Sequence, residues 1–173
     1  RQAARNFGIA SRKGRLIRQG ILPHLDLHQE GVLVNRLNKV LLLAKGDISH
    51  SIQGFCLNSR TGTEKFFCVQ PVTTQPGVIK IPAQTLPPQE NATHLEVKMI
   101  AVRVNFLERR ITGCSTATSL IDLQQHFKGI TLEANPPGKG TLLLVLQVRC
   151  FNGSMAIASR HYYAADILAA ITP

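Results

Sequence analysis

The stretch from Thr141 to Ala164 has the most regular pattern of apolar and polar positions in the chain. Its first part alternates with a period of two, which places successive side chains on opposite faces of a β-strand. One face is wholly apolar and carries Leu142, Leu144, Leu146, Val148 and Cys150. The other face carries Leu143, Val145, Gln147, Arg149 and Phe151. Asn152-Gly153 then predicts a type I′ turn, followed by a return strand from Met155 to Ser159. Because a two-stranded hairpin is not stable alone, we expect it to belong to a larger sheet with a second layer over it.

The first 45 residues predict two helices. Residues 2–22 place apolar side chains at helical spacing, and Pro23 predicts the end of this helix. The apolar stripe consists of Ala3, Phe7, Ala10, Gly14, Ile17 and Ile21. Residues 31–45 predict a second helix, which ends at the cation and glycine of Lys45-Gly46. The connection through residues 23–30 makes a helical hairpin.

The two helices also supply the candidate interaction residues. Six cations of the first helix lie largely off its apolar stripe, and no acidic residue occurs among them: Arg1, Arg5, Arg12, Lys13, Arg15 and Arg18. Such a face is either solvated or bound to an anionic partner. Leu42 and Leu43 make the second helix apolar almost all round near its end, which predicts burial inside the fold or contact with another copy. With Phe7, these residues form the candidate interface or anion-binding surface.

From Ser49 onward the pattern is typical of short strands. Residues 51–57 and 64–70 predict a first hairpin, and residues 78–81 a short strand that Pro82 ends. Residues 93–106 predict a long strand whose alternation changes phase near Ala101, as a β-bulge would produce. Two further strands are predicted at residues 117–123 and 130–133, and residues 164–171 form a short apolar tail. The predicted fold is mainly β with α: an antiparallel β-sandwich (residues 49–173) preceded by a basic helical arm (residues 1–48).

Composition limits the class of protein more than its function. A chain of 173 residues suits one domain, with or without an appendage. Its formal net charge is +10, and its first 50 residues hold nine basic and three acidic side chains. The excess permits nucleic acid, an anionic surface or an acidic neighbouring subunit as partner, and selects none of them. No apolar run approaches the roughly 20 residues that a bilayer crossing needs. The chain opens on Arg1 rather than Met, so we expect a trimmed start.

No motif predicts catalysis, a metal or a cofactor. The four cysteines have no C-x-x-C spacing, so buried free thiols are expected, with one bridge between neighbouring strands left open. His24 and His28 have metal-ligand spacing, but Pro23 disrupts a helix there. Cys114, Ser115, Asp122 and His126 lack the context of a nucleophilic site. The loop 135–140 lacks the full phosphate-binding spacing.

Two motifs point to a family. The first motif is Arg5-Asn6-Phe7-Gly8-Ile9-Ala10-Ser11, followed by Leu16-Ile17-Arg18 and Asn35-Arg36-Leu37. The second is the terminal hairpin, which ends in Ser159-Arg160-His161-Tyr162-Tyr163. The chain resembles an uncharacterised family of small basic proteins from Bacteroidota genomes. Members carry a further glycine-rich and basic segment before the first helix. The resemblance implies no established activity.

These features favour a non-enzymatic structural protein without cofactors. We expect a self-associating β-sandwich subunit of a filament, virion or tail-like assembly, whose partners are other copies of itself, because sheet edges accept a neighbour's strand. The alternative is sequence-independent nucleic-acid binding by the basic first helix, although Phe7 offers no stacking platform there. The compartment stays open, with an extracellular or virion assembly favoured over the cytoplasm.

Overall fold

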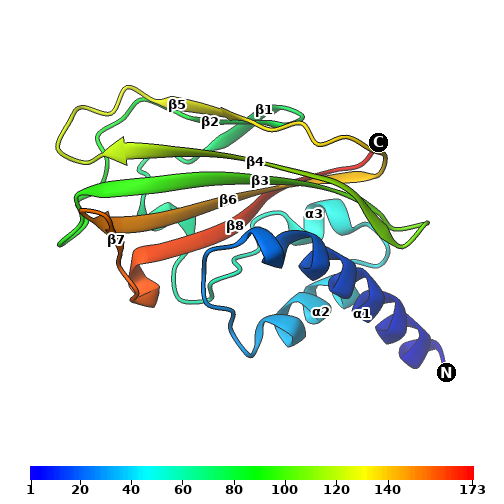
Figure 1. The fold of residues 1–173 in the computed structure, drawn as a ribbon. Coiled ribbons are helices and arrows are strands. Elements are labelled where there is room, and N and C mark those ends of the chain that lie inside the picture. Colours follow the sequence, from blue (N-terminus) through cyan, green and yellow to red (C-terminus); the bar gives the residue numbers. More distant parts are fainter.

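The computed structural model describes all residues from Arg1 to Pro173 and has three layers (Figure 1). The middle layer is a five-stranded antiparallel sheet, in which β4, β3, β6 and β7 follow one another and β8 also pairs with β6. A three-stranded sheet ordered β1-β2-β5 covers one face, and the helices cover part of the other. The helices are α1 (Gln2–Ile21), α2 (Leu33–Leu43) and α3 (Ile48–Ile52), with short 3₁₀ turns η1 (Leu22–His24), η2 (Thr63–Lys65) and η3 (Arg160–Tyr162). The strands are β1 (Val72–Gln75), β2 (Val78–Ile81), β3 (His94–Asn105), β4 (Arg110–Asp122), β5 (Ile130–Glu133), β6 (Thr141–Asn152), β7 (Met155–Ala156) and β8 (Tyr163–Ile171). The predicted antiparallel β-sandwich behind N-terminal helices is confirmed.

Strand β6 occupies the centre of the fold. It pairs with β3 on one side and with β7 and β8 on the other, and both of its faces are covered. The face that begins at Leu142 packs under the small sheet, while Leu143 and Val145 on the other face pack under the helices. The predicted alternation of this strand is therefore confirmed.

The turn after β6 differs from the predicted one. Asn152 is still in the strand and pairs with Met155, so the two turn residues are Gly153 and Ser154. Only Gly153 has a positive φ, of 59°, which fits a type II′ turn and not type I′. The return strand β7 is also shorter than predicted. It gives way to η3, where the Ser159 hydroxyl accepts a hydrogen bond from the backbone N–H of His161, and the chain then enters β8.

Strand β3 has no bulge at Ala101. Its pairing with β6 runs without a break from His94 to Val104. The change of phase in the sequence arises because both faces of β3 are buried, one under the small sheet up to Ala101 and the other under the helices from Ile100 onward. The register shift of this region lies at the Arg103–Val104 step of β3 and falls on β4, where Thr112 is the extra residue.

The predicted hairpin of residues 51–57 and 64–70 is wrong. Asp47 caps α3 by accepting a hydrogen bond from the Ser49 N–H at 3.0 Å, so residues 48–52 are helical. Residues 54–63, which we call the edge segment, then run beside β8. The hydrogen bonds from Gly54 N to the Ile167 carbonyl and from Leu57 N to the Ala165 carbonyl are both 2.7 Å long. The predicted apolar tail is accordingly β8, a strand of the main sheet.

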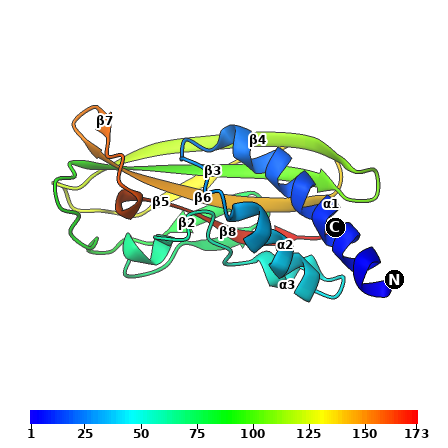
Figure 2. The same ribbon diagram turned by 90° about the horizontal axis from the view of Figure 1, so that it is seen from below.

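Helix α1 fastens to the sheet by only part of its length. Its stripe is buried from Ala10 to Ile21, as predicted, but the side chain of Phe7 is 55% exposed and Ala3 is exposed. The first turns of the helix extend past the sheet and carry the N-terminus outward (Figures 1 and 2). No helix of the fold is both long and apolar enough to cross a membrane.

The small sheet and the cysteines agree with the prediction in part. Strands β2 and β5 have the predicted bounds, whereas β1 was not predicted. All four cysteines are free thiols, as expected. Only Cys150 is fully buried, however; Cys56 and Cys114 are half-buried and Cys68 is exposed, so the predicted burial is wrong for Cys68 and is confirmed in full only for Cys150.

Candidate interaction surfaces

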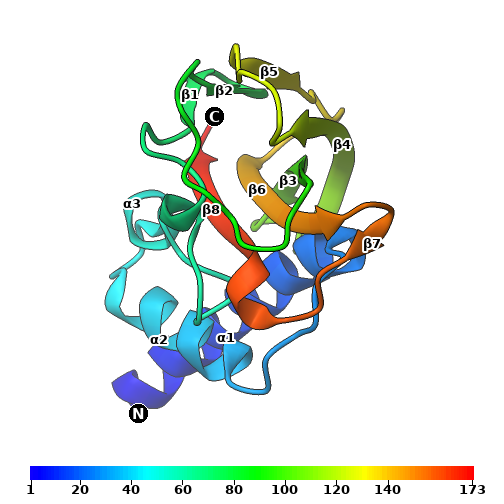
Figure 3. The same cartoon turned by 90° about the vertical axis from the view of Figure 1, so that its left-hand side faces the viewer.

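Strand β4 forms one margin of the large sheet (Figure 3). It pairs only with β3, and from Ile111 to Ile121 its backbone forms no hydrogen bond with any other segment. Every second N–H and C=O group along this stretch therefore points outward without a protein partner. The stretch has the sequence ITGCSTATSLI and contains neither a charged residue nor a proline. Natural edge strands commonly carry such residues to prevent pairing with other chains.

The other edges of the two sheets are protected. The outer side of β8 is occupied by the edge segment, which forms backbone hydrogen bonds with it. The margins of the small sheet, β1 and β5, are four residues long. Short edge strands offer few groups for pairing. Strand β4, with 13 residues, is thus the single long open edge of the fold.

A buried carboxylate helps to hold the edge segment over β8. Asp166 Oδ2 accepts hydrogen bonds from the Thr63 backbone N–H at 2.9 Å and from its hydroxyl at 2.8 Å. Asp166 Oδ1 is buried without a hydrogen-bond partner and lies beside Cys56. Burial raises the pKa of Asp166, although the Thr63 hydrogen bonds oppose the rise. Burial and the Asp166 charge raise the pKa of the Cys56 thiol to about 12, which makes it a poor nucleophile.

A second carboxylate fixes the start of α2. Glu30 is buried, and its Oε1 accepts hydrogen bonds from the Ser59 backbone N–H at 2.8 Å and the Ser59 hydroxyl at 2.6 Å. Its Oε2 pairs with Arg36 at 3.0 Å. Burial by itself would raise the pKa of Glu30, but the Ser59 hydrogen bonds and the Arg36 charge outweigh it, so the pKa is lowered.

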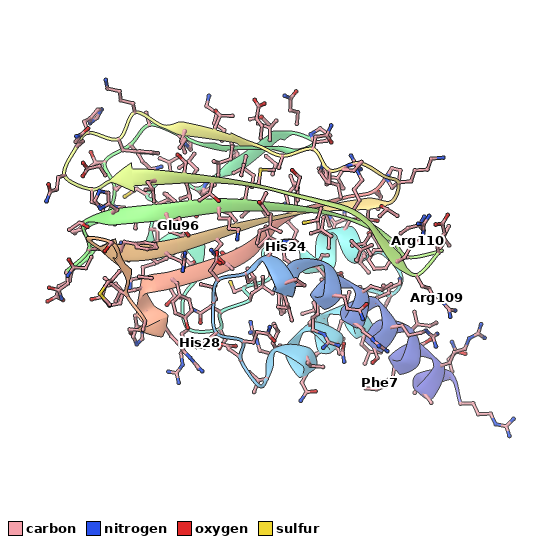
Figure 4. All side chains as sticks on the ribbon, viewed as in Figure 1. Phe7, His24, His28, Glu96, Arg109 and Arg110 are labelled. Carbon is pink, nitrogen blue, oxygen red and sulfur yellow. The ribbon has the colours of Figure 1, made fainter.

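The cations of α1 form the second candidate surface. None of the six takes part in a salt bridge, whereas four cations elsewhere in the chain do. Arg18 uses its Nε to donate to the Gly14 carbonyl at 3.2 Å, which leaves the rest of its guanidinium available. Arg109 and Arg110 lie at the β3–β4 turn, on the side of the molecule to which α1 extends (Figure 4). The positive charges of this surface are therefore not neutralised by any acidic side chain of the same protein.

The predicted apolar members of that surface are exposed on the helices. The side chains of Leu42 and Leu43 are 42% and 69% exposed, so the end of α2 is not sandwiched inside the fold. A groove of about 410 Å³ lies between α1 and the end of α2. Its lining includes Ile9, Leu42 and two lysines, Lys13 and Lys45. Phe7 projects from the same part of α1 (Figure 4).

The connection between α1 and α2 is held by a polar cluster that was not predicted. Asp26 Oδ2 accepts hydrogen bonds from Lys98 Nζ and Gln147 Nε2, both at 3.0 Å, while the Asp26 N–H donates to Gln147 Oε1 at 2.8 Å. Arg149 pairs with Glu96 at 2.8 Å beside them. Burial would raise the pKa of Asp26, but the Gln147 and Lys98 hydrogen bonds lower it overall. The cluster fastens the loop to the sheet and keeps its carboxylates occupied.

The residues considered for chemistry are not brought together. No three histidine, cysteine or acidic side chains lie close enough together to hold a metal ion. His24 and His28 lie apart from one another (Figure 4). Cys114 and Ser115 lie on opposite faces of β4. His126 is exposed in the loop after that strand.

Comparison of the chain with models of protein families, with curated proteins and with solved structures found no match. The resemblance to the Bacteroidota family stays a prediction.

The open edge of β4 was missed among the candidate residues. Its exposed members are Thr116, Thr118 and Leu120. The signal that could have identified it is the uncharged, proline-free run from Ile111 to Ile121, of which only the second half was predicted as a strand.

Proposed function

We propose that this chain is a non-enzymatic structural subunit that associates with other copies of itself through the open edge of its large sheet, as part of a filament, virion or tail-like assembly. The observation that carries the proposal is the contrast between the edges. The fold covers β8 with a dedicated segment, yet leaves the longer β4 edge unpaired and, from Ile111 to Ile121, without charge. An edge of this kind is a template for strand addition from another chain.

Light scattering on the purified chain tests this proposal. The wild type, eluted over a dilution series, is expected to show a mass that rises above the 19.0 kDa of one chain as concentration increases. Thr118→Lys places a charge on the exposed part of the open edge and is expected to lower that mass at equal concentration. Thr74→Lys, on exposed β1, is the matched control and should leave the mass unchanged. A wild type that stays at 19.0 kDa at every concentration and salt would overturn the proposal.

A second function, sequence-independent nucleic-acid binding, is favoured by one observation: the six cations of α1 have no ionic partner within the chain. Affinity for a random duplex should then fall steeply as salt rises. The double variant Arg12→Gln/Arg15→Gln should reduce the slope of log K against log salt by about 2, whereas Lys128→Gln, an exposed cation outside α1, should not change it. Absence of binding at low ionic strength would exclude this function.

A further inference from the structure

We propose that β4 pairs with β4 of a second copy, antiparallel and about a two-fold axis at Thr116. Thr116 then lies opposite Thr116, Cys114 opposite Thr118, and the Arg110 end of one strand opposite Asp122 of the other. The inference rests on the proposed self-association and specifies its geometry. Its result is one continuous ten-stranded sheet made from the two five-stranded sheets.

The hydrogen-bonding pattern of β4 sets the first condition on this pairing. Outward-pointing backbone groups alternate along the strand, so outward groups of two copies meet only when like positions face one another. A two-fold axis through Thr116 satisfies this condition for every pair between Gly113 and Ser119, the part of the ladder that lies between the Thr112 bulges of the two copies. The contact is also isologous, because each copy offers the same surface, as most homodimers do.

The charges at the two ends of β4 favour this register over the one shifted toward the β3–β4 turn. Asp122 is the first charged residue after Arg110, and the positions between them carry no charge. Antiparallel pairing centred at Thr116 brings each Asp122 to the Arg109–Arg110 end of the other strand. Moving the register by two residues toward the turn would instead place Asp122 opposite Glu108, an unfavourable pair of carboxylates. Arg110, which already pairs with Glu108 at 2.6 Å, is exposed enough to accept the second carboxylate.

On the face that the helices cover, β4 has room for a second copy, whereas the loop at Pro137–Lys139 already contacts Thr112 and Gly113 near its start. Helix α1 lies over the Ile111 end, where Gly20 approaches Ile111, while Thr116, Thr118 and Leu120 on the same face are exposed. A two-fold axis perpendicular to the sheet places the covered end of one copy beside the uncovered end of the other. The side chain of Leu120, which is 64% exposed, then gains a neighbour from the second copy. The self-complementary charge pattern favours this occupant over a strand from a different protein.

Cysteine cross-linking tests the register directly. In a background of Cys68→Ser and Cys114→Ser, Thr116→Cys should form an intermolecular disulfide under mild oxidation, since directly opposite strand residues have Cα atoms about 4.5–5.5 Å apart, within disulfide range. Leu120→Cys is the register control. Its two copies would lie about 27 Å apart, eight residues at about 3.4 Å each, and should not cross-link. Thr74→Cys on β1 measures collisional cross-linking.

The expected result is at least a tenfold excess of cross-linked Thr116→Cys over both controls, with light scattering of the reduced variants matching the wild type. Two results would overturn the register and leave self-association intact. One is that Leu120→Cys cross-links in preference to Thr116→Cys. The other is that neither variant cross-links although light scattering still reports a dimer. Monomers at every concentration would overturn both, and would leave the edge to a strand of another protein.

Discussion

The substitution Gly14→Ala is expected to leave the fold less stable than Gly8→Ala in the same helix, and Gly8→Ala is expected to stabilise it. Alanine is more favourable than glycine inside a helix by about 1 kcal/mol. A Cβ at Gly8 would have no heavy atom within 4 Å. A Cβ at Gly14 would overlap the amide oxygen of Asn38 and lie 3.3 Å from Leu41 Cδ1, because α2 packs closely against α1 at this point.

The magnitude follows from comparing the two variants. The helix propensity gained is the same at both positions, so the difference between them is the overpacking at Gly14, about 1–3 kcal/mol. For a protein of this size, 1 kcal/mol shifts the melting temperature by about 2–4 °C. Gly8→Ala should therefore melt about 2–4 °C above the wild type, and Gly14→Ala about 2–12 °C below Gly8→Ala.

Thermal and urea unfolding followed by circular dichroism measure both shifts. The double variant Gly14→Ala/Asn38→Ala provides the specific check, because removing the Asn38 oxygen should recover about 0.5–3 kcal/mol of the overpacking in a double-mutant cycle. Equal stabilisation by Gly8→Ala and Gly14→Ala, with no coupling to Asn38, would show that α1 and α2 do not meet as described.

Three further predictions concern titratable groups. Burial raises the pKa of Asp166, so its contribution to the free energy of unfolding is present below about pH 4 and is lost as pH rises through the raised pKa. The variant Asp166→Asn should therefore be more stable than the wild type at neutral pH and should lose that advantage in acid. The pKa of Glu30 is lowered, so its contribution to the free energy of unfolding is present above about pH 4.3 and is lost as pH falls through the lowered pKa. Glu30→Gln should therefore destabilise the fold by about 1.5–3 kcal/mol at pH 7, and unfolding experiments near pH 3 should show a smaller difference. Maleimide labelling should modify exposed Cys68 in the native protein and Cys150 only after unfolding, because Cys150 is fully buried and burial raises its pKa to about 11.

The parts of the fold that the sequence predicted are those determined by local pattern. Strand β6 is recognisable because its alternation is long and is followed by Asn-Gly, and β2 is bounded by Pro82 directly after it. Helix α1 is recognisable by its stripe and by Pro23 at its end. In each case the deciding residues are neighbours in sequence, so no knowledge of distant partners is needed.

Three of the errors occurred where a distant partner decides the structure. The edge segment lacks a hairpin because its hydrogen-bond partners belong to β8, about 110 residues later in the chain. The bulge expected at Ala101 was an effect of burial on both faces, which local alternation cannot distinguish from a change of register. The open edge escaped notice for the same reason, since the order of strands in a sheet is not a local property.

The protection of all long edges except β4 also limits how far association can proceed. Each molecule has one edge that can pair with another copy. A two-fold contact occupies this edge in both molecules, so strand pairing by itself produces a dimer and nothing larger. A longer polymer would need a different surface for its next bond, and the dimer would then be its repeating unit.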